Sequence, residues 1–106
     1  MAGLIELGRR AGASLVTVAP VVAQAWRGGA RQARLAQLLP MVEVRGTGLR
    51  EARAAGELLA ASGMTDAVDA LIAMVALPGD QLLTSDPTDI ETLVMHRAIA
   101  VTVVRL

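Results

Sequence analysis

Short apolar runs alternate with longer amphipathic segments along this chain, and no other feature of the sequence constrains its fold as strongly. Runs rich in Val, Leu and Ile predict strands at 15–18, 41–44, 81–84 and 99–104. Helices are predicted at 2–11, 21–27, 30–39, 49–62, 66–77 and 87–97. Short apolar strands separated by helices are typical of parallel sheets that are buried on both faces. The sequence therefore predicts an α/β fold in which a parallel sheet is flanked by helices.

Composition narrows the classes of function. The 106 residues are 54% hydrophobic and 19% charged, as in one domain with a packed core. Ten basic residues, all arginine, balance ten acidic ones, so any contact with a nucleic acid must come from a local patch. The absence of cysteine excludes disulfides, thiolate metal sites and cysteine catalysis. No apolar stretch is long enough to span a bilayer, and the first residues make a poor signal peptide, which together favour the cytoplasm and no membrane partner.

One carboxylate stands out in the most apolar helix. Asp69 is the only charged residue between Ala67 and Leu77, in a helix that we expect Thr65 to cap. A helix that is apolar on all sides is buried on most of them. A lone carboxylate there is costly unless it is hydrogen-bonded, paired or bound to a metal ion.

Segment lengths predict that Asp86 returns to Asp69. The helix runs about 12 Å from Asp69 to its end, and the strand at 81–84 climbs back by a similar length. Asp66 and Asp89 are expected at the same carboxyl edge of the sheet, where open α/β folds place their sites. Four converging carboxylates repel one another, and a hard cation such as Mg²⁺ relieves that repulsion.

Three of these residues also have a structural interpretation. Asp66 lies in the first turn of a helix, where an acid favours the helix dipole. Asp86 precedes Pro87 and suits an N-cap, with Asp89 as an acid in the first turn. Capping alone could therefore explain Asp86 and Asp89, whereas Asp69 has no comparable explanation.

The stretches DALIA at 69–73 and LLTSD at 82–86 resemble the two C-terminal acidic motifs of the PIN domain family, which includes the VapC-type toxin ribonucleases. The stretches 20–39 and 56–59 are similar to the same family, so the resemblance covers nearly the whole chain, 1–106, as one PIN-like domain. It implies hydrolysis of an RNA substrate that depends on Mg²⁺ or Mn²⁺, with Asp69 and Asp86 as catalytic metal ligands. Asp66 and Asp89 would be auxiliary ligands. The implied partners are an antitoxin whose tail lies across the active site and, as an open alternative, a second copy of the chain.

Two departures from the family pattern qualify these implications. Gln24 occupies the position of the second acid, and a neutral amide binds a cation more weakly than a carboxylate does. The first acid and its strand have no counterpart, so the domain is predicted to be incomplete at its N-terminus, without the first central strand. The strands at 15–18 and 81–84 would then pair directly or take a strand from a partner. We expect weak or absent RNA cleavage, and the alternative is a catalytically inactive PIN remnant that acts as a protein-binding module.

The remaining candidates are isolated residues. Trp26, the one aromatic residue, is predicted in the core, with an anchor in a partner's groove as the alternative. A single aromatic argues against binding a single strand on a row of stacked side chains. Arg27 and His96 are expected at the surface, with a contact to phosphate as the alternative for Arg27.

Overall fold

Four parallel strands form the sheet of this protein, in the order β2-β1-β3-β4. The computed structural model describes residues 13–106, so the predicted helix at 2–11 lies outside the described residues. The strands are β1 (Leu15–Val18), β2 (Val42–Arg45), β3 (Gln81–Thr84) and β4 (Thr102–Arg105). The helices are α2 (Ala19–Ala25), α3 (Gly29–Leu38), a 3-10 turn η1 (Leu39–Met41), α4 (Leu49–Ser62), α5 (Ala67–Val75) and α6 (Pro87–Arg97). The predicted α/β fold with a parallel sheet flanked by helices is confirmed.

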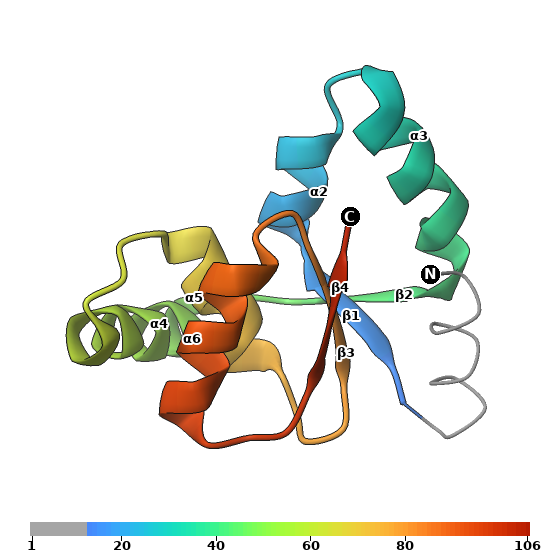
Figure 1. Cartoon of the computed structure of the whole chain (residues 1–106). Helices are drawn as coiled ribbons and strands as arrows, with labels where there is room; N and C mark the ends of the chain where they lie inside the picture. The colour runs from blue at the N-terminus through green and yellow to red at the C-terminus, as the bar shows by residue number, and fades with distance from the viewer. Residues whose placement is uncertain (1–12) are drawn as a thin grey trace.

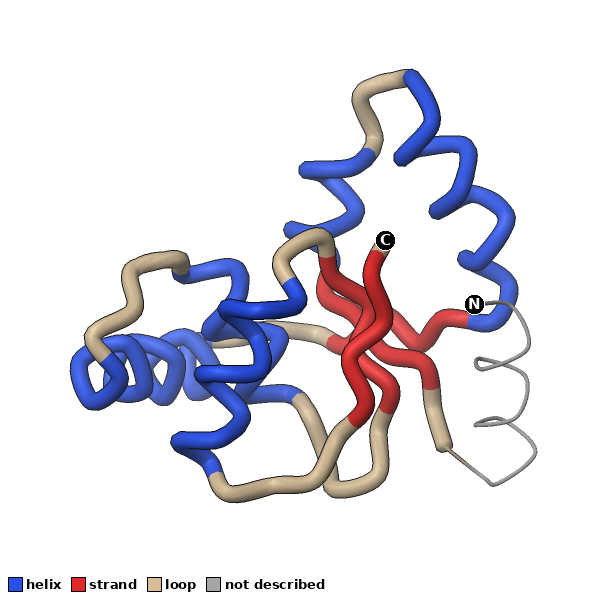
Figure 2. Tube along the Cα trace, viewed as in Figure 1, coloured by secondary structure: helices blue, strands red, loops and turns tan. Residues whose placement is uncertain are grey.

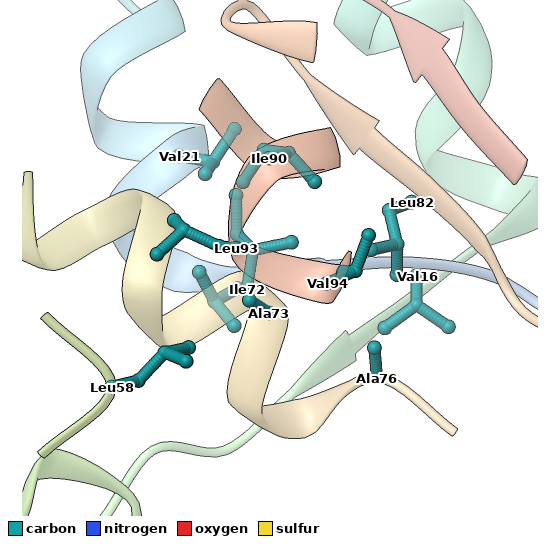
Figure 3. Close-up of a cluster of buried hydrophobic side chains, with 11 residues drawn as sticks. Val16, Val21, Leu58, Ile72, Ala73, Ala76, Leu82, Ile90, Leu93 and Val94 are labelled. Carbon is teal, nitrogen blue, oxygen red and sulfur yellow. The ribbon is translucent and has the colours of Figure 1, made fainter. Parts of the chain in front are cut away.

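Helices cover both faces of the sheet (Figure 1). Side chains of a strand alternate between faces. Val16, Val18 and Leu82 face the layer of α4, α5 and α6, with which they share a core cluster (Figure 3). Leu15 and Leu83 face α3 and the end of α2 in a second cluster. Because β1 and β3 are buried along their whole length, they form the centre of the domain.

Several element boundaries match the sequence prediction to the residue, and two of the differences have local causes. Helix α4 ends as predicted at Gly63, whose φ of 73° is the left-handed conformation that glycine adopts without strain. Helix α5 ends at Val75 instead of Leu77, since Pro78 disfavours the helical conformation in the residue before it. Strand β4 begins at Thr102 instead of Ile99, because its pairing with β3 starts where the Thr102 amide donates to the Asp80 carbonyl, at 2.9 Å.

The two central strands pair directly, which is the first of the alternatives expected from the sequence. Leu15 is in register with Gln81 and Val16 with Leu82, and the pairing ends there. Beyond it the buried Thr17 hydroxyl donates to the Leu83 carbonyl at 3.0 Å and bridges the two strands where the ladder has stopped. The regular pairing of β1 with β3 thus stops before their carboxyl ends, within the group of strands at the centre of the fold (Figure 2). That a further central strand is missing from the chain stays a prediction.

Two arginines fix the C-terminal end of α5. Arg97 donates from Nη1 to the carbonyl oxygens of Ala73 and Ala76, at 2.6 and 2.8 Å. Arg45 donates to the Val75 carbonyl at 2.8 Å and forms an ion pair with the buried Asp80 at 2.6 Å. Cations at a helix C-terminus satisfy its last carbonyls and favour its dipole. This anchoring sets the position of α5 and of the carboxylates at its other end.

Within residues 13–106 no single helix has the length and hydrophobicity needed to cross a membrane, and α4 and α5 reach that threshold only as a pair bent by 111°.

Candidate metal centre

The first carboxylate of the site caps α5. Asp66 is the N-cap residue, and its Oδ1 accepts hydrogen bonds from the amides of Val68 and Asp69 at 2.9 and 3.1 Å. The prediction that Thr65 caps this helix is therefore wrong. Asp is an equally good N-cap, and starting the helix one residue later gives its carboxylate two amide donors. Asp66 thus has a structural role at the start of this helix, as its N-cap and not as the acid of the first turn that the sequence predicted, and the two hydrogen bonds fix the direction of its carboxylate.

Asp69 lies one turn further along α5 and is the buried member of the site. Its exposed fraction is 5%, and among the described residues its Oδ2 has no hydrogen-bond partner although that atom is fully buried. Burial first, and the negative charges of Asp66, Asp86 and Asp89 second, raise the pKa of Asp69 to about 7. A buried carboxylate with an oxygen that lacks a partner is the arrangement that a cation or a proton would relieve.

Asp86 projects from the loop between β3 and α6. It occupies the N-cap position of α6, before Pro87, but its side chain makes no capping hydrogen bond. Its own amide donates to the Thr84 hydroxyl at 3.0 Å, which fixes the backbone of the loop. The alternative that capping accounts for Asp86 is therefore wrong, and its exposed carboxylate is available to a ligand.

Three carboxylates converge at the carboxyl edge of the sheet. One oxygen each of Asp66, Asp69 and Asp86 lies within 4.8 Å of the others. The convergence of Asp69 and Asp86, expected from the segment lengths, is thus confirmed. Asp89 does not belong to this group of three, although its charge raises the pKa of Asp69. Its role as a ligand stays a prediction.

Gln24, which the resemblance to the PIN family suggested as a substitute for an acidic ligand, is exposed on α2. Val21, one turn before it, packs in the same core cluster as Ile90, one turn after Asp86, so α2 runs beside the start of α6 (Figure 3). In the described part of the chain, however, no hydrogen bond joins the Gln24 side chain to the three carboxylates. The role expected of Gln24 as a weak substitute ligand stays a prediction.

This acidic triad, Asp66, Asp69 and Asp86, could hold a metal ion. All its donors are hard carboxylate oxygens, the ligands that Mg²⁺, Mn²⁺ and Ca²⁺ prefer. Within residues 13–106 every ion pair involves Arg45, so no arginine neutralises the triad. Charge compensation at this site is left to a proton or to a cation.

Two isolated predictions had opposite outcomes, and one interaction was missed. The side chain of Trp26 is 46% exposed, so its assignment to the core is wrong. His96 is exposed, as expected, with its Nδ1 at 3.0 Å from the Thr92 carbonyl. The ion pair of Arg45 with Asp80 was missed because the two residues are 35 positions apart and no motif links them.

Comparison of this chain with family models, with curated proteins and with solved structures gave no match, so its site is interpreted from its own geometry.

Proposed function

We propose that this chain is a PIN-like domain whose acidic triad binds one Mg²⁺ or Mn²⁺ ion for the hydrolysis of RNA phosphodiester bonds. The observation that carries the proposal is the approach of three carboxylate oxygens to within 4.8 Å of one another without a cationic side chain among the described residues. Such a cluster is costly unless a cation is present. The similarity of 69–73 and 82–86 to the PIN acidic motifs adds the type of reaction.

The three residues would divide the work by their burial. Asp69, which is buried, would release its proton when a cation binds and hold the ion at the base of the site. Asp66, whose Oδ1 is engaged with two amides, would present its other oxygen in a fixed direction. Asp86, which is exposed, would complete the ligand set on the side open to substrate. When bound, the cation supplies a water activated at neutral pH and positive charge beside the phosphate.

We expect slow RNA cleavage from this chain. Only three carboxylates converge, and Gln24 would contribute a neutral amide where the family has an acid. Fewer anionic ligands lower the affinity for Mg²⁺, and they also leave less charge to orient a second ion. The same proposal includes a location in the cytoplasm, an antitoxin as binding partner and assembly into a homodimer.

The neutral Gln24 also favours a second candidate. A domain that keeps the fold and a weakened cation site but hydrolyses nothing would act as a protein-binding module, with an antitoxin-like partner as its ligand. The two candidates differ in turnover and agree on cation binding.

One set of measurements separates them. Titration calorimetry with Mn²⁺ measures cation binding, and cleavage of a structured RNA in Mg²⁺ or Mn²⁺ measures turnover, each with the wild type, Asp69→Asn and Glu57→Gln. Glu57 is an exposed carboxylate on α4 and serves as the matched control. Binding and cleavage that are lost only in Asp69→Asn support the nuclease. Binding without cleavage supports the module, and a failure of the wild type to bind Mn²⁺ overturns both.

A further inference from the structure

We propose that the α2–α3 arm, residues 19–38, is a binding surface for single-stranded nucleic acid, on which Trp26 stacks against a base while Arg27 and Arg31 contact phosphates. The proposal rests on the function proposed above, since it supplies the substrate contacts that the acidic triad cannot make. Because the chain has a net charge of zero, it needs a local basic patch to attract a polyanion, and the arm would be that patch.

Charge is strongly segregated along the chain. Residues 19–41 contain Arg27, Arg31 and Arg34 and no acidic residue. Residues 64–96 contain six acidic residues and no arginine; Asp80, at the other end of β3, pairs with Arg45, and Asp66, Asp69, Asp86 and Asp89 lie at or beside the triad. A protein that is neutral overall therefore has a cationic arm and an anionic edge. The arm attracts a phosphate backbone, whereas the acidic edge repels it unless a cation is bound.

The tip of the arm holds its aromatic side chain on an ordered turn. The amides of Trp26 and Arg27 donate to the carbonyls of Val22 and Ala25, both at 2.9 Å. The Gly28 amide donates to the Gln32 side chain at 2.6 Å, and Gly28 has a φ of 81°, which favours glycine. Trp26 is 46% exposed on this fixed backbone. A large aromatic surface presented in this way loses little conformational entropy on binding.

The arm contains two arginines that the fold does not use. Arg27 and Arg31 are exposed and form no ion pair within residues 13–106. Arg34, by contrast, turns back and donates to the Arg105 carbonyl at 3.3 Å. Arg27 lies in the turn between α2 and α3, and Arg31 lies in the first turn of α3; this turn is the tip of the arm (Figure 1).

The arm rises from the same edge of the sheet as the triad. Helix α2 follows β1 directly, and its Val21 packs in one cluster with Ile90 of α6, the helix that Asp86 precedes. At 1.5 Å per residue, Trp26 lies about 8 Å further along the helix than Val21. A short strand bound by the arm would thus run from its tip towards the carboxylates.

These features favour a single strand over a duplex or a peptide. Stacking on Trp26 requires a base with a free face, which a duplex does not offer along its length. An apolar peptide groove would need neighbouring apolar side chains, but the exposed residues close to Trp26 in the sequence are small, polar or cationic: Ala23, Gln24, Arg27, Gly28 and Gly29.

Intrinsic fluorescence tests the proposal directly, because Trp26 is the only tryptophan and the chain has no tyrosine. The Asp69→Asn protein, in EDTA to prevent cleavage, is titrated with an oligouridine of roughly 8 nucleotides, a usual site size for one strand. We expect quenching of Trp26 emission. With a labelled oligonucleotide, Trp26→Ala should weaken binding by roughly 5- to 150-fold. Trp26→Phe, which keeps a stacking face, should retain most of the affinity and shows that the loss is not one of folding.

The arginines are tested by the salt dependence of the same titration. The double variant Arg27→Ala/Arg31→Ala should bind more weakly and lower the slope of log affinity against log salt by about 1.4, since each phosphate contact in a single strand contributes about 0.7. Arg53→Ala, an exposed arginine on α4, is the matched control and should change neither quantity.

Three results would overturn the proposal. The first is no quenching of Trp26, and the second is an effect of Arg53→Ala equal to that of Arg27→Ala/Arg31→Ala. The third is that variants of the arm bind the oligonucleotide normally but convert a dimer to a monomer in light scattering. The last would identify the arm as a face for a second copy of the chain. Because the titration contains EDTA, its failure is distinguishable from failure of the Mn²⁺ titration, which tests the triad alone.

Discussion

Asp69 and Asp86 come from different elements, the buried helix α5 and the loop after β3, and their carboxylate oxygens lie within 4.8 Å of each other. Their proximity has an energetic consequence in the absence of a cation. Two carboxylates at this distance do not both ionise readily, and the buried one retains its proton to a higher pH. The pKa of about 7 for Asp69 follows from its burial first and from Asp66, Asp86 and Asp89 second.

Replacement of Asp69 by asparagine should stabilise the metal-free protein at alkaline pH. The pKa of Asp69 is raised from 3.8 to about 7 in the folded state. Between these values the unfolded chain loses this proton and the folded chain keeps it, so the wild type loses stability as the pH rises through this window. At about 1.4 kcal/mol per pKa unit the loss is roughly 4 kcal/mol at most. The Asp69→Asn variant carries no titrating group at this position and therefore avoids the loss.

Urea unfolding in EDTA at a series of pH values checks this. The variant should be the more stable protein near pH 8, and this advantage should be lost near pH 3, below the unfolded pKa of 3.8, where Asp69 is protonated in the folded state and largely so in the unfolded chain. Glu57→Gln should follow the wild type throughout. If the free energies of unfolding of the wild type and of Asp69→Asn changed in parallel with pH, the raised pKa of Asp69 would be refuted.

A divalent cation should reverse this pattern. Mg²⁺ or Mn²⁺ that binds only the folded state at 100 times its dissociation constant stabilises it by about 2.7 kcal/mol. The melting temperature should rise by about 4–8 °C for each kcal/mol. The rise should be larger near pH 8 than near pH 5, because at pH 5 the cation must displace a proton from Asp69.

Scanning calorimetry with cation and with EDTA measures the effect. Asp69→Asn and Asp86→Asn should each lose most of the rise, whereas Glu57→Gln should keep it. An equal rise in all four proteins would mean that the cation acts elsewhere than at the triad.

The capping roles of Asp66 and Asp86 should differ although both precede a helix. Asp66 caps α5 with two hydrogen bonds, so Asp66→Ala should be less stable than Asp66→Asn by about 1 kcal/mol, because asparagine can make the same cap. Asp86 makes no capping bond, so Asp86→Ala and Asp86→Asn should agree within a few tenths of a kcal/mol. Urea unfolding of the four variants measures the difference in stability between the Ala and Asn variants at each position. Equal differences at positions 66 and 86 would contradict the conclusion that only Asp66 caps its helix.

Segment lengths and residue patterns were sufficient to predict the sheet and the meeting of Asp69 with Asp86. The sheet follows from short apolar runs that alternate with helical segments. The meeting of the two carboxylates follows from the regular rises per residue along α5 and β3, which sequence gives directly. The interactions that end the elements were not accessible in this way. The cap at Asp66 instead of Thr65 depends on which side chain reaches two amides, a difference of one residue between two good capping types.

Tertiary contacts explain the other differences. Arg45 and Asp80 meet because β2 and β3 are arranged on either side of β1, a strand order that local sequence does not specify. The exposure of Trp26 has a similar origin. Its hydrophobicity predicts burial, but it lies on the turn after α2, where the neighbouring Ala25 takes the core position.

Loss of Asp80 should be much more costly than loss of Glu43, although both pair with Arg45. The Asp80 side chain is 8% exposed and also accepts from the Leu77 amide at 2.7 Å, whereas the Glu43 side chain is 53% exposed. Removing one partner of a buried ion pair costs about 3–5 kcal/mol, and an exposed pair contributes at most about 1 kcal/mol. Urea unfolding of Asp80→Ala and Glu43→Gln gives the comparison. Similar losses would show that Asp80 does not fix the end of α5.

The direct pairing of β1 with β3 should protect amides at the centre of the sheet within a single molecule. Val16 and Leu82 are in register, which engages the amides of Val16 and Leu83 between these two strands. Hydrogen exchange of both should therefore be slow and should not change with protein concentration.

The Val103 amide is an internal control, because Thr102 and Leu106 donate towards β3 and the alternation of the strand turns Val103 away from it. Val103 should exchange faster. Protection of Val16 and Leu83 that appears only as the concentration rises would show that a second chain completes the sheet, and rapid exchange at every concentration would contradict the direct pairing itself.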